Sequence, residues 1–348
     1  MGKISDRIVD PGEQYEDDWE GHTFRPRLFK DFIGQGKIKD QLKIAIEAAR
    51  SRGDVLEHVL LSGPQGLGKS TISNIIAHEM DVGIRTTVGP LLVQKADLAA
   101  ILTNLQHGDV LFIDEIHRTR SEIQEMLYPA MEDYRLDIIL GQGPSARTVP
   151  IPLPRFTLVG ATTRMGLLSA PFRDRFGVNL RLDFYGTQDL KEIIKRDARL
   201  LKVEIDVESG ADGIIAGRSR GTPRVAKRML RRVRDYVKVR KDGVVTAEST
   251  SEALEFYEVD ELGLEEMDRG ILRTIIEKFD GGPVGISTIA ISVNEEERTI
   301  EDAHEPYLIQ AGLISRTPRG RVVTKLAYEH LGLEPPRQTQ QPDLWDQS

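Results

Sequence analysis

The chain carries a short stretch whose residue types suit phosphate binding. Residues 63–71 read Gly-Pro-Gln-Gly-Leu-Gly-Lys-Ser-Thr, which fits the pattern of a glycine, four residues and then Gly-Lys-Ser/Thr. An apolar run, Val59–Leu61, precedes the stretch, and a helical pattern follows from Ser70 to about Met80. Glycines let backbone N–H groups turn toward an anion, and the helix N-terminus adds its positive end. The stretch therefore predicts a nucleotide-binding loop.

Each residue type in this loop has a predicted task. The ammonium group of Lys69 would reach the β- and γ-phosphates, and the hydroxyl of Ser70 would bind Mg²⁺. We expect nucleotide contacts from Gly63, Gly66, Leu67, Gly68, Lys69, Ser70 and Thr71.

A second apolar run ends in two acids. Val110–Ile113 is followed by Asp114 and Glu115. A carboxylate at such a strand end can hold Mg²⁺ through water, which is the role expected of Asp114. Glu115 would act as general base on the attacking water. The next apolar strand ends at residues 160–164, where the hydroxyl of Thr163 could orient that water; a simple strand-end turn is the alternative.

Two arginines could add positive charge at the γ-phosphate. Arg175 ends a presumed short helix, and an arginine supplied in trans can stabilise charge that develops during phosphoryl transfer. A surface ion pair with Asp174 explains the same spacing. Arg224 follows Pro223 at the start of a basic helix and could fold over the nucleotide. An ordinary solvated arginine is the alternative there.

Composition sets the broad class. The chain has 348 residues, 39% of them hydrophobic and 29% charged, which is normal for a globular protein of two or three domains. There are no cysteines, no apolar run of membrane-spanning length and no signal-peptide pattern at the start, so we expect a cytoplasmic protein. The net charge is −8, yet residues 218–240 and 316–325 are locally basic.

The elements that must position these residues follow from the order of the patterns. Short apolar runs alternate with helical patterns, which predicts an α/β fold with a parallel sheet. Residues 136–156 read as a β-hairpin with a long tip. A helix after residue 299, two short strands and a basic turn at residues 317–320 predict a winged helix. We expect domains at residues 21–184, 185–256 and 257–333, with disordered segments at 1–20 and 334–348.

Taken together, the motifs resemble the RuvB family of bacterial AAA+ ATPases. The resemblance runs from about Phe24 to Leu333. It rests on a set of motifs in the same order: residues 63–71, 111–117, 128–133, 160–164, 173–177, 220–224 and 316–321. So many ordered motifs are far more specific than a phosphate loop alone.

The resemblance implies a fold, partners and cofactors. The fold would be an AAA+ P-loop domain, a small helical lid and a C-terminal winged helix. The chain would form a homo-hexamer around duplex DNA. It would use ATP and Mg²⁺ to drive branch migration at a four-way junction with RuvA, and with RuvC in the resolving complex.

The resemblance also implies residue roles. Arg175 would be the arginine finger, Thr163 sensor 1 and Arg224 sensor 2. Contacts near the nucleotide would come from Phe24, Arg25, Tyr185, Glu132, Asp133 and Tyr134. The hairpin would dock RuvA through Leu136, Ile138 and Val149, although core packing also explains these apolar residues. The wing would contact DNA phosphates through Arg316, Arg319 and Arg321.

The sequence departs from the family pattern at a few positions. Gln65 stands where the family usually has a proline, and Ser70 where it has a threonine; the serine keeps the hydroxyl that Mg²⁺ needs. Glu297 stands where an arginine is frequent, so a DNA contact there would have to come from Arg298.

Two other functions fit parts of the pattern. A clamp-loader or helicase-loader ATPase shares the same core and would require a sliding clamp. A nucleotide-gated DNA-binding scaffold would need no hydrolysis, so Glu115→Gln would leave it intact. The basic region 218–240 also has two interpretations, since part of it could pair with acidic surfaces of a neighbouring subunit.

Overall fold

The computed structural model describes residues 25–140 and 147–335. The chain forms two compact units that divide between Ser251 and Glu252, and each is described by itself below. The predictions for residues 1–20, for Phe24 and for residues 336–348 lie outside the described ranges. None of the helices within those ranges is both long and apolar enough to span a membrane.

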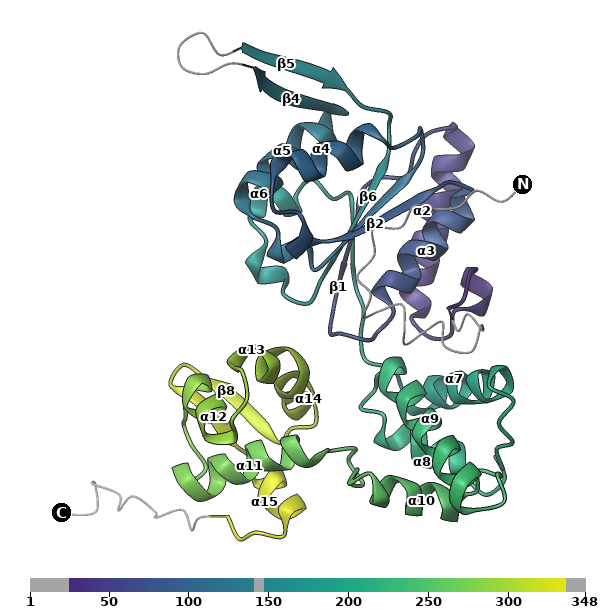
Figure 1. The fold of residues 1–348 in the computed structure, drawn as a ribbon, viewed down its shortest axis with the longest axis vertical. Coiled ribbons are helices and arrows are strands. Elements are labelled where there is room, and N and C mark those ends of the chain that lie inside the picture. The colour runs from purple at the N-terminus through teal and green to yellow at the C-terminus, as the bar shows by residue number, and fades with distance from the viewer. Residues whose placement is uncertain (1–24, 141–146, 336–348) are drawn as a thin grey trace, which may run out of the picture. The chain divides into compact units, whose positions relative to one another are not determined.

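A parallel sheet organises the first unit (Figure 1). Two neighbouring strands, β1 (Val59–Ser62) and β6 (Thr157–Thr162), are buried along their whole length because helices cover both faces of the sheet, and most of their residues are apolar. This confirms the predicted α/β class. In spatial order the strands are β2 (Ile84–Val88), β3 (Val110–Asp114), β6 (Thr157–Thr162), β1 (Val59–Ser62) and β7 (Val178–Arg181).

Helices lie on both faces of this sheet (Figure 1). One face is covered by α2 (Gly36–Arg52) and α3 (Lys69–Met80). The other carries α4 (Lys95–Thr103), α5 (Ser121–Glu132) and α6 (Ala170–Arg173). Short 3₁₀ turns complete the connections: η2 (Phe29–Asp31), η3 (Gly89–Leu91), η4 (Ile116–Arg118) and η6 (Met165–Leu167).

The predicted hairpin is present and projects from this domain (Figure 1). It pairs β4 (Arg135–Leu140) with β5 (Arg147–Pro152) in antiparallel register. Ile138 lies opposite Val149, and Leu136 lies opposite Ile151 at the base. Side chains two residues apart share a face of a strand, so these four apolar residues belong to one face of the hairpin.

Four helices follow the sheet: α7 (Thr187–Leu200), α8 (Ala211–Arg218), α9 (Pro223–Arg240) and α10 (Ala247–Phe256). Helix α9 is the predicted basic helix. Its buried side chains recur at helical spacing and form one apolar stripe, which leaves the basic residues on the remaining surface. The stripe consists of Ala226, Met229, Leu230, Val233 and Val237.

The second unit is a winged helix. Its elements are α11 (Glu266–Phe279), α12 (Ile286–Val293), α13 (Glu297–Thr299), η7 (Ile300–His304), α14 (Glu305–Gln310), β8 (Ile314–Thr317), β9 (Gly320–Val323) and α15 (Lys325–Leu331). The third helical segment is less regular than predicted, because a π-helical turn, η7, separates α13 from α14. The wing pairs β8 with β9, and Arg316 lies opposite Arg321.

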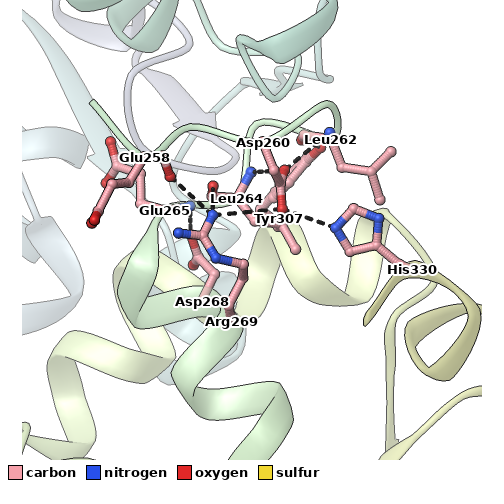
Figure 2. A network of polar contacts seen from close by, with 9 residues as sticks. All are labelled: Glu258, Asp260, Leu262, Leu264, Glu265, Asp268, Arg269, Tyr307 and His330. Atoms are coloured by element: carbon pink, nitrogen blue, oxygen red, sulfur yellow. Dashed lines mark hydrogen bonds and ion pairs between the residues drawn. The ribbon is translucent and has the colours of Figure 1, made fainter. Parts of the chain in front are cut away.

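A polar network fixes the segment that leads into this domain (Figure 2). Oδ1 of Asp260 accepts hydrogen bonds from the backbone N–H groups of Leu262 (3.0 Å) and Leu264 (2.7 Å). Its Oδ2 lies 2.9 Å from Nε2 of His330 on α15. Arg269 on α11 donates to the Leu264 carbonyl at 2.8 Å. The connecting segment is thus tied to two helices of the winged-helix body.

Candidate functional site

The phosphate loop joins β1 to α3 and has the backbone that its glycines allow. Gly63, Gly66 and Gly68 have φ of 140°, 74° and 102°, a region that side chains disfavour. A Cβ on Gly63 would lie 2.6 Å from the Leu182 carbonyl oxygen. Nζ of Lys69 donates to the carbonyls of Gly63 and Pro64, both at 2.8 Å. The lysine is therefore nearly buried within its own loop.

A cavity of about 840 Å³ opens above this loop, within the range of small-molecule sites. Both the sheet domain and helix α9 line it, and both belong to the first unit. The structure brings most of the predicted nucleotide residues together here: Arg25, Gly66, Leu67, Gly68, Lys69, Ser70, Thr71, Asp114, Glu115, Thr163, Tyr185 and Arg224.

Sheet topology explains why distant motifs meet. Strands β3, β6 and β1 are adjacent and parallel, so their carboxyl ends lie at one edge of the sheet. That edge carries Asp114 after β3, Thr163 after β6 and the phosphate loop after β1. Nδ1 of His117 lies 3.1 Å from Oγ1 of Thr162, which links the turn after β3 to the end of β6.

The two acids differ in conformation and partners. Oδ1 of Asp114 accepts a hydrogen bond from the N–H of Glu115 at 2.8 Å. Glu115 has φ of 46°, in the left-handed region, and starts the η4 turn. Its Oε2 lies 2.5 Å from Nη1 of Arg118, which also lines the cavity. Sequence reasoning did not single out Arg118; its spacing of three residues from Glu115 is the signal that could have found it.

Tyr185 connects the phosphate loop to the helical domain. Its hydroxyl donates to the Leu67 carbonyl at 3.1 Å, and its backbone N–H donates to the Gly221 carbonyl at 2.8 Å. Burial is the main cause that raises the pKa of the Tyr185 phenol above its ordinary value. The phenol is therefore neutral at physiological pH and acts as a hydrogen-bond donor.

Helix α9 forms a basic wall of the cavity. Its first turn approaches the loop, since the N–H of Arg224 points to the Gly66 carbonyl at 3.4 Å. Lys227, Arg228 and Arg231, further along the same helix, line the cavity as well. Sequence reasoning connected only Arg224 to the nucleotide and left the others undecided. These residues follow Arg224 by three, four and seven positions, and this helical spacing is the signal that places them on the same face of the helix as Arg224.

A buried acid on α7 interacts with the basic residues of this wall. Asp197 on α7 accepts hydrogen bonds from Arg196 at 2.9 and 3.0 Å and is almost fully buried. Burial raises the pKa of its carboxyl group, while the charges of Lys227, Arg196 and Arg231 oppose that rise. The cavity lining contains more arginine and lysine than acidic residues, so it suits a polyanion such as a nucleotide phosphate chain.

Arg175 is not among the residues that line the cavity of its own chain. Its Nη2 lies 3.2 Å from Oε1 of Glu132 on α5, and its guanidinium group lies 4.1 Å from the centre of the Tyr128 ring. The ion-pair partner is therefore Glu132 and not Asp174. Asp133 and Tyr134, next to Glu132, do not line the cavity either.

The hairpin residues divide by burial. Leu136 is fully buried in the hydrophobic core of the sheet domain, so for this residue core packing is the correct interpretation and a direct contact with RuvA is not. Ile138 is half-buried and Val149 is 39% exposed. Ile138 and Val149 are thus a cross-strand apolar pair that is accessible to a partner.

The wing arginines also divide by burial. Arg316 and Arg319 are exposed, and Nη2 of Arg316 lies 3.3 Å from Oε1 of Glu301. Arg321 is only 8% exposed and is bound to Glu305, so the prediction of a direct DNA contact by Arg321 needs correction: its guanidinium group is used inside the domain. Arg298 is exposed and pairs with Asp302 at 3.4 Å.

Comparison with known proteins agrees with this architecture. Three family models match in order: the Holliday junction DNA helicase RuvB P-loop domain at residues 24–182, the RuvB AAA lid domain at 185–260 and the RuvB C-terminal winged helix domain at 261–332. The matches account for most of the chain and include the loop, the lid helix and the wing described above.

Solved structures of Thermotoga maritima RuvB are similar to most of this chain. The structure described as its Holliday junction branch migration motor has 50% identity and a TM-score of 0.82, and the match covers 89% of this chain and 99% of that one. A lysine-to-arginine variant of that protein has 50% identity and a TM-score of 0.83, and the match covers 89% of this chain and 99% of that one. An arginine-to-alanine variant of that protein has 50% identity and a TM-score of 0.83, and the match covers 90% of this chain and 99% of that one. The chain therefore belongs to the RuvB family of AAA+ ATPases.

Proposed function

We propose that this chain is an ATP-driven DNA motor that promotes branch migration of Holliday junctions with RuvA in homologous recombination and DNA repair. The observation that carries the proposal is the shared cavity, in which the phosphate loop of the sheet domain faces Arg224 of the lid helix. A nucleotide held there touches both domains, so its hydrolysis can change how they are held together. The proposed substrate is cellular DNA, so we expect the motor to act in the cytoplasm.

The residues present fit ATP and Mg²⁺. The positive-φ glycines leave the loop N–H groups accessible, and Lys69 supplies positive charge. Ser70 and Asp114 both line the cavity and carry the oxygen atoms that Mg²⁺ prefers. When bound, the ion would neutralise charge on the β- and γ-phosphates. We assign it to Ser70 and, through water, to Asp114.

Hydrolysis would proceed by in-line attack of water on the γ-phosphorus. Glu115 would accept the proton of that water, and the Thr163 hydroxyl would orient it. Lys69 and Arg224 would stabilise the charge that develops on the phosphoryl oxygens and on the leaving group. This arrangement catalyses mainly by position and electrostatics, as is usual for phosphoryl transfer.

Arg175 fits a role in a neighbouring subunit of a hexameric ring. It does not line its own chain's cavity, and its side chain, which is 21% exposed, contacts Glu132 and Tyr128. A mixture of Arg175→Ala with Lys69→Ala chains tests the role. If the finger acts in trans, mixed rings regain part of the ATPase activity that each variant lacks alone. Two inactive variants that stay inactive when mixed would contradict the assignment.

The hairpin fits a docking element for RuvA. Ile138 and Val149 lie opposite each other on the face that Leu136 anchors in the core. Because the two strands are anchored in the core, their outer apolar side chains lose little conformational freedom when a partner binds. Association with RuvC in the resolving complex follows from the family and is proposed on that basis. We also retain residues 21–184, 185–256 and 257–333 as the domain division.

Branch migration of a synthetic four-way junction tests the function directly. We expect this chain with RuvA and ATP to convert the junction into duplex products, and Lys69→Ala to leave it intact. If ATP is hydrolysed while the junction persists with RuvA, a loader-type ATPase becomes the better account. Glu115→Gln separates a motor from a nucleotide-gated scaffold, because only the motor loses its activity with this change.

A further inference from the structure

Arg196 on α7 connects the helical domain to the sheet domain. Its Nη1 donates a hydrogen bond to the carbonyl of Asp31 in η2, at 3.2 Å. The side chain is 25% exposed and lines the same cavity as the phosphate loop. A nucleotide in that cavity therefore lies beside a hydrogen bond that joins the two domains. We call this bond the Arg196 link.

The buried carboxylate of Asp197 holds the guanidinium group of Arg196. Nε and Nη2 of Arg196 both donate to Oδ1 of Asp197, at 3.0 and 2.9 Å. Two bonds to one planar guanidinium group restrict its rotation, and they leave Nη1 for the Asp31 carbonyl. Asp197 itself is 1% exposed and is not among the residues that line the cavity. Any effect of Asp197 on a bound nucleotide is therefore indirect.

Stability alone does not explain an acid at position 197. Oδ2 of Asp197 is buried and has no hydrogen-bond partner within the described part of the chain. A buried charge that is only partly paired costs free energy, and an apolar residue of similar volume is often at least as stable there. The charges of Lys227, Arg196 and Arg231 act on this carboxyl group, and all three cations line the cavity. The acid thus lies where its charge acts on the cations of the nucleotide cavity.

The segment at the other end of the Arg196 link is fixed to the sheet domain. Asp31 precedes Phe32, whose carbonyl accepts a hydrogen bond from Nζ of Lys39 on α2 at 2.7 Å. A Cβ on Gly68 would lie 3.2 Å from the Phe32 ring, so this ring packs against the phosphate loop. The Arg196 link therefore holds α7 on a segment that is itself packed on the phosphate loop.

The cavity is lined by both domains, so separation of the domains allows a bound nucleotide to leave. Separation of α7 from η2 breaks the Arg196 link, and the link therefore opposes release. We propose that Arg196 is a positioning residue that slows nucleotide release by joining α7 to Asp31, and that Asp197 orients Arg196 for this contact. The inference rests on the proposed function, because it requires that the cavity binds ATP and ADP.

Displacement of mant-ADP, a fluorescent ADP, by excess ATP measures the release rate from the full chain in a stopped-flow instrument. For Arg196→Met we expect release to accelerate about tenfold, the size of one hydrogen bond to a charged group. For Asp197→Asn we expect about threefold, because Arg196 loses its charged partner but keeps its own donors. The rate of a single hydrolysis turnover should stay within about twofold of wild type, which a general loss of folding would not allow.

The double variant Arg196→Met/Asp197→Asn tests whether Asp197 acts through Arg196. If it does, the double variant releases mant-ADP at the same rate as Arg196→Met. Effects that multiply would show that Asp197 acts by another route, and the proposal would be wrong. The double variant also contains no unpaired buried charge at this position, so it remains a valid test if Arg196→Met alone is unstable.

A cross-link separates the Arg196 link from a direct contact between Arg196 and the nucleotide. The chain has no cysteines, so Asp31→Cys/Arg196→Cys can be joined selectively by a short bismaleimide. This variant lacks the guanidinium group, and before cross-linking we expect release about tenfold faster than wild type. After cross-linking, release should return to the wild-type rate or fall below it. Release that stays fast after cross-linking would overturn the proposal in favour of a direct contact.

Two matched controls come from the same domain. Arg199→Met removes the same charge from α7 at an exposed position that does not line the cavity. Asp212→Asn removes another buried acid, on α8, which lies 3.6 Å from Lys195 and outside the cavity lining. Both should release mant-ADP at the wild-type rate. Faster release from Asp212→Asn would point to general loosening of the helical domain and against the Arg196 link.

The same assay distinguishes failure of this inference from failure of the proposed function. If the wild-type chain binds neither mant-ADP nor ATP, the proposed function fails and the inference fails with it. If the wild-type chain binds both and Arg196→Met releases mant-ADP at the wild-type rate, only the Arg196 link is wrong.

Discussion

Arg321 and Glu305 form a two-point ion pair inside the winged-helix domain. Nε of Arg321 donates to Oε1 of Glu305 at 2.7 Å, and Nη2 donates to Oε2 at 3.1 Å. The residues are 8% and 4% exposed. Nη2 also reaches Glu301 at 3.2 Å. The pair joins strand β9 of the wing to helix α14, so it fixes the angle at which the wing leaves the domain.

The first prediction is that Arg321→Ala destabilises the winged helix strongly. The change leaves Glu305 charged, buried and unpaired, which costs about 3–5 kcal/mol. Denaturant unfolding monitored in the winged-helix domain measures the loss. Arg319→Ala, at the exposed turn of the same wing, is the control and should stay within about 0.5 kcal/mol. A stable Arg321→Ala protein that fails only in DNA binding would restore the direct-contact interpretation.

The second prediction concerns DNA affinity and salt. Arg316 and Arg319 are the exposed cations of the wing, so each alanine substitution should weaken duplex binding for all sequences alike. Each lost phosphate contact should reduce the slope of log K against log salt by about 0.9. Arg298, like Arg316, has one acidic partner, but it also adjoins the acids of residues 295–297, which repel phosphate. We therefore expect Arg298→Ala to keep the wild-type slope; an equal loss there would extend the DNA surface to α13.

The third prediction tests the contact between the phosphate loop and the lid. A Cβ on Gly66 would lie 2.8 Å from Cγ2 of Thr222 and 2.9 Å from Cβ of Arg224, at a φ of 74°. Gly66→Ala must therefore move the loop away from α9, and we expect KM for ATP to rise at least tenfold and kcat to fall. Gly217→Ala is the control, since Gly217 lies in α8 with no atom near the added Cβ. Wild-type kinetics for Gly66→Ala would show that the loop and lid need not touch.

The sequence predicted the central elements well because their signals are local and strong. The runs around Val59, Val110 and Thr157 are mainly apolar, since those strands are largely buried between two helix layers. The edge strands β2 and β7 were not predicted. Both contain polar residues and are only partly buried, so neither shows a continuous apolar run.

The site was predictable to the extent that it is built from motifs. The loop and the two acids meet as expected because parallel topology brings strand ends together. Arg224 reaches the same cavity from the first turn of helix α9. Burial of individual side chains could not be predicted. The sequence left Leu136 open to both core packing and a partner contact, and the structure places it in the core. The resemblance implied a DNA contact for Arg321, but this residue pairs with Glu305, sixteen residues earlier. Such partnerships depend on tertiary packing, which spacing does not encode.

The fourth prediction is a pH dependence of stability from Tyr185. Burial raises the pKa of its phenol in the folded state above the unfolded value of about 10. The stability from the neutral phenol is fully present below pH 10 and is lost as the pH rises toward the folded pKa, at up to about 1.4 kcal/mol per pH unit. Tyr185→Phe cannot ionise but loses the hydrogen bond to Leu67, which costs about 1 kcal/mol at neutral pH. Unfolding free energies from pH 7 to 11 should show the wild-type advantage shrink above pH 10; a constant difference would contradict this.

The fifth prediction concerns the connecting segment of Figure 2. Asp260→Ala removes the acceptor for two backbone N–H groups and the partner of His330, so we expect a loss of about 2 kcal/mol in the winged-helix unit. Hydrogen exchange should accelerate at the Leu262 and Leu264 amides in particular, because these lose their acceptor. Glu329→Ala is the control, since its pair with Lys325 is exposed and should contribute little. If exchange at both amides stays slow in Asp260→Ala, the segment is held by Arg269 and by the Tyr307 hydroxyl, which donates to the Leu262 carbonyl, and not by Asp260.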